Sequence, residues 1–221
     1  MLNEVEARVL GALMEKEITT PDYYPLSLNA LVNACNQKSN RDPAMNLDDD
    51  AVRSALRALH DNSLARSVSA ADSRVTKYEH RLQEAFNFDR REAAIFCELL
   101  VRGPQTPGEL RSRAERMHHF DDLSEVQSAL QRLMNREPPL VKVLARQPGT
   151  KESRHVHLLC GDAEPVSSLA EREAPAAARR QSPESANAGT TLSRLDADVA
   201  ELRREIADLK EQFAAFRKQF E

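Results

Sequence analysis

The chain is poor in cysteine, glycine and aromatic residues: its 221 residues include three Cys, six Gly, no Trp and only 5% aromatic side chains. The cysteines, Cys35, Cys97 and Cys160, are widely separated and form no CxxC pair, so we expect reduced thiols. With 41% hydrophobic and 30% charged residues, the chain is long enough for two small cores, which we expect to be packed by Leu, Val and Ala.

Long apolar runs are also missing. No run approaches the roughly 18 residues of a membrane span, and the acidic Glu4 and Glu6 do not resemble a signal peptide, so we expect a cytoplasmic protein with no membrane partner. No GxSxG, P-loop, GxGxxG or HExxH motif occurs, and we therefore predict neither an enzyme nor a cofactor.

One compact group of potential metal ligands is present: His118, His119, Asp121 and Asp122. Such residue types suit a hard or borderline cation. Adjacent histidines seldom converge on one ion together with both carboxylates, however, and one of the aspartates is expected to cap a helix. We therefore predict no metal site.

Positive charge is not in excess, since the formal net charge is −4 and residues 1–160 carry 22 Lys and Arg against 23 Asp and Glu. Neutralisation of phosphates supplies most of the non-specific affinity of a protein for DNA. A DNA site in this chain therefore requires local clusters of Lys and Arg.

The sequence does contain the same order of elements twice before residue 160. Residues 3–82 and 89–159 each predict a long amphipathic helix, a short capped helix, a second amphipathic helix and two strand-like runs. Ser27 and Thr106 stand at equivalent positions as the expected caps of the short helices. Three helices followed by a two-stranded hairpin is the order of the winged helix-turn-helix. We therefore expect a mainly α fold with small β-hairpins (α+β), made of winged-helix domains at 1–84 and 85–160.

Beyond residue 160 the composition changes. Residues 161–189 are rich in Ala, Pro, Ser, Glu and Arg without apolar periodicity, which predicts a disordered linker. Residues 190–221 carry apolar heptads, which predict a coiled-coil helix and a parallel homodimer. Its core positions are Leu192, Leu195, Val199, Leu202, Ile206, Leu209, Phe213 and Phe216. The same stripe also suits folding back on the winged domains or binding a helix of another protein.

Local clusters of positive charge are candidates for nucleic-acid contact. Arg53 and Arg57 lie off the apolar stripe of their helix, so both are expected to face outward. The full candidate set lies on or beside the predicted second helices, third helices and hairpin tips: Lys38, Arg41, Arg53, Arg57, Arg111, Arg113, Arg146, Lys151 and Arg154. The alternative is that these are ordinary solvated side chains, because Asp48 to Asp50 lie at the helix end that would approach phosphate.

Three segments give the chain a resemblance to a known family. MEKEITTPDYYPLSLNALVNACNQKSNRDPAMNL (14–47), RGPQTPGELRSRAERMHHFDDL (102–123) and REPPLVKVLARQPGTKESRHVHLL (136–159) resemble the bacterial YceH family of uncharacterised proteins. The resemblance implies a pair of winged-helix domains and carries over no functional residue.

A long polar insert, residues 36–43, separates the second and third helices of the first repeat. Either it presents a binding surface beside the third helix, or its Asn, Ser and Asp-Pro residues only build turns, with Arg41 paired to an acid such as Asp42 or Asp48.

Two functions are compatible with these features. The first is a dimeric DNA-binding protein, a transcriptional regulator in which the coil sets the spacing of two half-sites. The second is an interaction module that binds protein without DNA contact. In this respect the chain would resemble the tandem winged helices of segregation and condensation protein B. The near-neutral charge favours the second function, whereas the arginines of the third helix and hairpin favour the first, which is our prediction.

Overall fold

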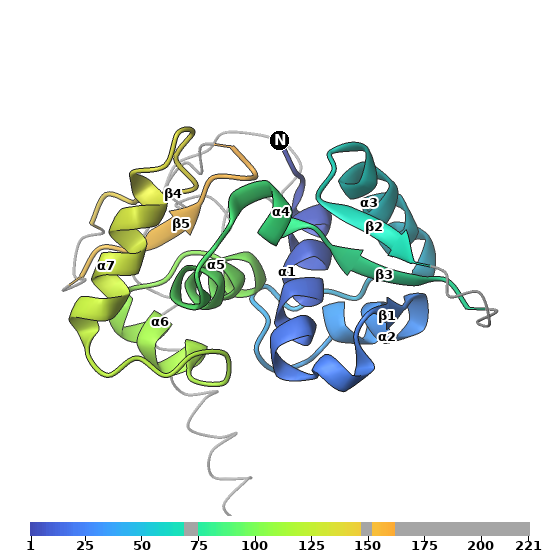
Figure 1. The fold of residues 1–221 in the computed structure, drawn as a ribbon, viewed down its shortest axis with the longest axis horizontal. Coiled ribbons are helices and arrows are strands. Elements are labelled where there is room, and N and C mark those ends of the chain that lie inside the picture. The colour runs from blue at the N-terminus through green and yellow to red at the C-terminus, as the bar shows by residue number, and fades with distance from the viewer. Residues whose placement is uncertain (69–74, 147–151, 162–221) are drawn as a thin grey trace, which may run out of the picture. The chain divides into compact units, whose positions relative to one another are not determined.

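The elements of the chain follow the predicted order. The computed structural model describes residues 1–68, 75–146 and 152–161, and within these ranges it contains seven α-helices and five short strands, which confirms the mainly helical α+β composition (Figure 1). The predicted coiled coil at 190–221, the linker beyond Gly161 and Lys151 lie outside the described residues. No helix in those ranges has both the length and the apolar character needed to span a bilayer.

The first repeat forms three helices and a three-stranded antiparallel sheet. Its elements are α1 (Glu4–Thr19), a 3-10 turn η1 (Pro21–Tyr23), β1 (Leu26–Ser27), α2 (Leu28–Cys35), α3 (Asp49–Asp61), β2 (Ala65–Val68) and β3 (Lys77–His80). The strand order is β1-β3-β2, so the hairpin predicted from the sequence gains a third, unpredicted strand from the residues just before α2.

The second repeat has the same order of helices and hairpin. Its elements are α5 (Arg90–Arg102), α6 (Pro107–Ala114), α7 (Leu123–Met134), β4 (Val141–Val143) and β5 (His155–His157), preceded by the short connecting helix α4 (Leu82–Phe86). The pair β4 and β5 is antiparallel. Gln105, just before α6, forms an isolated bridge to His155 of β5, so it takes the position that β1, just before α2, has in the sheet of the first repeat.

Polar side chains fix where the helices begin. Ser27 and Thr106 cap α2 and α6 by accepting from the backbone N–H groups of Ala30 and Glu109, which confirms the caps expected from the sequence. Asp48 caps α3 in the same way, so this carboxylate is held at the positive end of its own helix.

The two repeats share one hydrophobic core, whose centre is the packing of α1 against α5. Gly11 makes the close approach possible: a Cβ atom at this position would lie 2.8 Å from both Leu100 Cβ and Val101 Cγ1. The described residues therefore belong to a single compact unit in which the relative placement of the two repeats is fixed by buried side chains.

Candidate nucleic-acid interface

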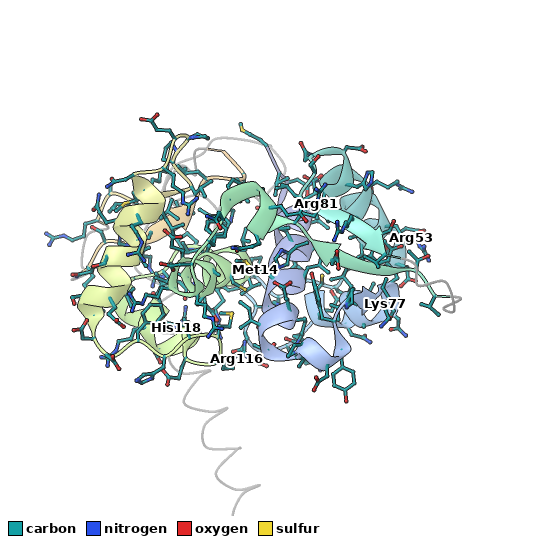
Figure 2. The ribbon with its side chains drawn as sticks, in the orientation of Figure 1. Met14, Arg53, Lys77, Arg81, Arg116 and His118 are labelled. Atoms are coloured by element: carbon teal, nitrogen blue, oxygen red, sulfur yellow. The ribbon has the colours of Figure 1, made fainter. Side chains whose placement is uncertain are left out.

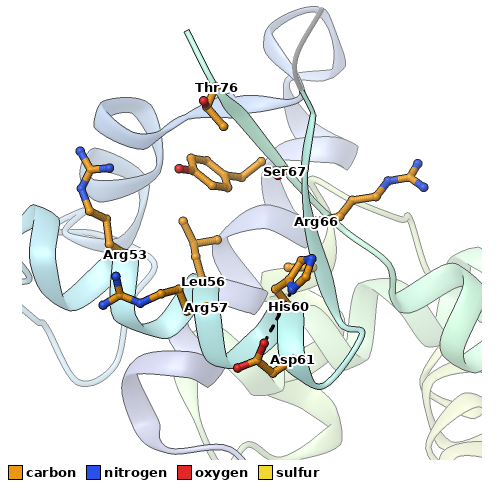
Figure 3. A pocket seen from close by; sticks show the side chains of 10 residues that line it. Arg53, Leu56, Arg57, His60, Asp61, Arg66, Ser67 and Thr76 are labelled. Carbon is orange, nitrogen blue, oxygen red and sulfur yellow. Dashed lines mark ion pairs between the residues drawn. The ribbon is translucent and has the colours of Figure 1, made fainter.

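A groove opens between α3 and the β2–β3 hairpin of the first repeat (Figure 3). Val52, Ala55 and Leu59 are buried in the core, which turns the opposite side of the amphipathic α3 toward solvent and the hairpin. The groove has a volume of about 420 Å³. Its lining consists of residues from the helix and from both strands or their flanks: Arg53, Leu56, Arg57, His60, Asp61, Ala65, Arg66, Ser67, Thr76 and Tyr78.

The three parts of this lining differ in chemistry. Leu56, Ala65 and Tyr78 supply apolar and aromatic surface, with Tyr78 directly opposite Ser67 in the register of the hairpin. Ser67 and Thr76 add hydroxyl groups on the hairpin side. The helix side carries the guanidinium groups of Arg53 and Arg57.

The positive charge of these two arginines is not compensated within the described part of the chain. Arg53 and Arg57 are exposed, and neither forms an ion pair or hydrogen bond with a residue of that part. The acid beside them, Asp61, lies 3.7 Å from His60 Nδ1, and Arg66 is occupied by Glu79 at 2.5 Å. Arg53 and Arg57 therefore line the groove without an acidic partner among residues 1–68, 75–146 and 152–161.

Lys77 is an exposed residue at the start of β3, between Thr76 and Tyr78, which line the groove. Figure 2 shows Arg53 and Lys77 at the end of the molecule formed by α3 and the hairpin, well apart from Arg116 and His118 of the second repeat. Sequence patterns did not identify Lys77 or Tyr78 as neighbours of α3, because only the return of the hairpin brings β3 to that helix.

Arg41 is not available for contact with nucleic acid, contrary to the prediction from the sequence. Its side chain is fully buried, with Nη2 2.6 Å from Glu15 Oε2, Nη1 donating to Glu15 Oε1 at 3.2 Å, and Nε donating to the Ala34 carbonyl at 3.0 Å. A guanidinium held in this way is inaccessible to a phosphate. Its acidic partner is Glu15 of α1, and neither of the acids expected from the sequence, Asp42 or Asp48, takes that role.

The polar insert that contains Arg41 joins the two repeats. Arg116 of the second repeat forms an ion pair with the same Glu15, and the Asp42 N–H donates to the Val101 carbonyl at 3.0 Å. Arg8 donates to the carbonyls of Pro43 and Val101 at 2.7 and 3.4 Å. Burial alone would raise the pKa of Glu15, but hydrogen bonds from Arg41 and Arg116 outweigh that effect and hold the pKa below its ordinary value.

Three candidate arginines of the second repeat form contacts within that repeat. Arg111 donates to the carbonyls of Phe120 and Asp121 at 3.2 and 2.7 Å. Arg113 and Arg154 both pair with Glu109, at 3.5 and 3.0 Å. These side chains link α6 to the loop before α7 and to β5.

The remaining candidates, Lys38 and Arg146, are exposed, in the polar insert and after β4 respectively. Of the candidates in the described ranges, therefore, the structure places only Arg53 and Arg57 in one groove.

The potential metal ligands of the second repeat are also engaged. His119 Nδ1 lies 2.6 Å from Glu115 Oε1, and Asp122 caps α7 by accepting from the Glu125 N–H. Among residues 1–68, 75–146 and 152–161, no group of three or more His, Cys, Asp or Glu side chains is arranged to hold a metal ion.

Comparison with known proteins gives one consistent family. The family model described as a protein of unknown function, DUF480, matches residues 2–150. A UPF0502 protein of Koribacter versatilis is 66% identical over 159 residues, covering 72% of this chain and 74% of the relative. Those of Solibacter usitatus and Pelobacter propionicus are 54% and 50% identical, over 92% and 100% of this chain and 93% and 99% of their own lengths.

Proposed function

The chain belongs to the DUF480, or UPF0502, family of uncharacterised bacterial proteins, and we propose that it is a non-enzymatic DNA-binding protein built from two winged helix-turn-helix units. The repeated order of three helices and a hairpin supports this architecture. In a winged helix the third helix enters the major groove and the hairpin contacts the backbone beside it. In this chain these elements are α3 and the β2–β3 hairpin.

The observation that carries the proposal is the pair of exposed arginines on α3, which have no acidic partner within the described ranges. A guanidinium that is free of acidic partners is available for bidentate contact with a phosphate or with the O6 and N7 atoms of guanine. Lys77 adds a positive charge in the last residue pair before the turn of the hairpin, opposite Val68, on the element that touches phosphates in a winged helix. The exposed carboxylates of Asp49 and Asp50 would repel the phosphates of DNA from the first turn of α3. The proposed contact with DNA is therefore made by the middle of α3 and by the hairpin.

Among the described residues of the second repeat, which leave out 147–151, no equivalent surface is present on α7. On α7 the exposed positions include Gln127 and Gln131, and Arg132 is held by Asp89 and Glu92 at 2.8 and 3.3 Å. We therefore assign the principal DNA contact to the first repeat. A parallel coil at 190–221 would bring two first repeats together, as required of a regulator that binds two half-sites.

Retention of DNA at several salt concentrations tests this function. The full chain is titrated against mixed genomic DNA fragments from about 50 mM salt upward, because phosphate contacts weaken steeply with salt. Arg53→Ala and Arg57→Ala should each weaken binding by about 1–3 kcal/mol if the arginine reads a base, or reduce the salt slope by about 1 if it contacts a phosphate.

Arg90→Ala is the matched control. Like Arg53 and Arg57, Arg90 is an exposed helical arginine with no ion pair within the described ranges. It is the first residue of α5 and is not part of the groove. Absence of retention near 50 mM salt, or equal weakening by Arg90→Ala, would refute a DNA site on α3.

Protein binding is the second candidate function. It is favoured by the net charge of −4 and by the engagement of Arg111, Arg113 and Arg154 in intramolecular contacts. If DNA is not retained, chemical cross-linking in cell extract followed by mass spectrometry should identify a protein attached to the first repeat. A cross-linking pattern unchanged by Arg53→Ala and Arg57→Ala would exclude α3 from that contact.

A further inference from the structure

The groove between α3 and the hairpin also has the properties of a small-molecule site. Ligand pockets typically enclose about 300–1,000 Å³ and combine apolar surface with a few polar groups that fix orientation. At about 420 Å³, the groove lies within that range, and it has an apolar and aromatic part beside its two arginines.

The charge of the groove selects for a negative ligand. Arg53 and Arg57 stand on the helix side, whereas the acid in the lining, Asp61, is at the far end of α3 and faces His60. An oxyanion between the two guanidinium groups would accept charge-assisted hydrogen bonds, which are about twice as strong as neutral ones.

The rest of the lining selects for a ligand with an apolar body. Leu56 is only 5% exposed and forms the inner part of the groove together with Ala65, which is 2% exposed. Tyr78 adds an aromatic side chain from the hairpin, and Ser67 and Thr76 supply hydroxyl groups on the same side. An aromatic body stacked in this region would remove both its own surface and that of Leu56 and Tyr78 from water.

We propose that this groove binds a small organic anion, with a phosphate or carboxylate head held by Arg53 and Arg57 and a flat apolar body against Leu56 and Tyr78. Binding needs neither DNA nor the second repeat. A consequence that does rest on the proposed function is competition: a ligand that occupies the two arginines blocks their contact with DNA.

Titration of the ¹⁵N-labelled full chain with four probes tests the site. Phenyl phosphate and benzoate carry both parts of the proposed ligand, with a phosphate and a carboxylate head respectively. Inorganic phosphate carries the head alone, and phenol carries the body alone. At least one of the first two should cause saturable amide shifts at Arg53, Leu56, Arg57 and Tyr78, with an affinity at least tenfold above that of inorganic phosphate and of phenol.

Variants identify the groups responsible. Arg53→Gln with Arg57→Gln should weaken binding of the tighter probe at least tenfold, whereas Arg90→Gln should leave it unchanged. The spectrum of the free double variant shows whether the fold is kept. Equal affinity for inorganic phosphate, shifts outside the groove, or equal weakening by Arg90→Gln would overturn the proposal.

Competition is measured separately, by adding the tighter probe to a complex with fluorescent DNA. Displacement at the concentration that saturates the groove supports the shared use of both arginines. If the probe binds and DNA is never retained, the proposed function fails and the anion site stands. If DNA is retained and no probe binds, the anion site fails and the proposed function stands.

Discussion

Replacing Arg41 by Ala should destabilise the protein by about 3 kcal/mol, although the sequence alone makes this residue a candidate for DNA contact. The side chains of Arg41 and Glu15 are both 0% exposed, and the guanidinium donates to both carboxylate oxygens and to the carbonyls of Ala34 and Asn40. Removing it takes away the two hydrogen bonds from Arg41 to the buried Glu15 carboxylate and the donor to the buried Ala34 carbonyl.

The magnitude follows from the remaining partners of the carboxylate. Removing one member of a buried ion pair costs about 3–5 kcal/mol, because the other charge is left uncompensated. Two cations still pair with Glu15: Arg116 of the second repeat, whose side chain is 42% exposed, and Lys16, whose Nζ lies 3.8 Å from Oε2. The loss should therefore lie at the lower end of that range. For a domain of this size, about 3 kcal/mol corresponds to a fall in Tm of about 6–12 °C.

Urea and thermal unfolding followed by circular dichroism at pH 7 provide the measurement. A second variant, Glu15→Leu with Arg41→Met, removes both charges and should recover part of the loss, since a buried pair replaced by apolar side chains of similar volume is often nearly neutral. A loss below about 1 kcal/mol for Arg41→Ala would refute the assigned coupling. So would a double variant whose loss equals the sum of the losses of Glu15→Leu and Arg41→Met measured singly. The salt slope of DNA binding should not change in Arg41→Ala.

Three further results are expected. Gly11→Ala should cost about 1–3 kcal/mol in urea unfolding, because its Cβ would lie 2.8 Å from Leu100 Cβ, whereas Gly108→Ala, with nothing within 4 Å, should not destabilise. Burial lowers the pKa of His157 from 6.5 to about 4, so the folded state resists protonation and stability falls as the pH drops below 6.5. His157→Leu should reduce the loss between pH 7 and pH 4.5 by about 2 kcal/mol, and an unchanged pH dependence would contradict this cause. Removing residues 190–221 should convert a dimer to a monomer in light scattering, and an unchanged mass would refute the heptad assignment.

The helices, their order and their starts could be predicted from the sequence because the signals are local. Apolar spacing marks one face of a helix, and a hydroxyl or carboxylate three residues before a free N–H marks its first turn. Ser27, Thr106 and the exposed Arg53 and Arg57 are therefore where the sequence places them. The short β1 was missed, because two residues give no periodicity.

Which charges are free was decided only by the tertiary structure. In the sequence, Arg41 and Arg53 look alike, as basic residues in or near a third helix. Their difference comes from Glu15, 26 residues before Arg41, which the packing of α1 buries under the polar insert. The groove beside Arg53 likewise exists only because the hairpin returns to α3 and brings Tyr78 and Thr76 opposite the arginines.

The sequence thus determined which segments form helices and hairpins, since each depends on neighbours within a few residues. The partners of each charge, and hence the candidate site, depended on contacts between residues far apart in the chain.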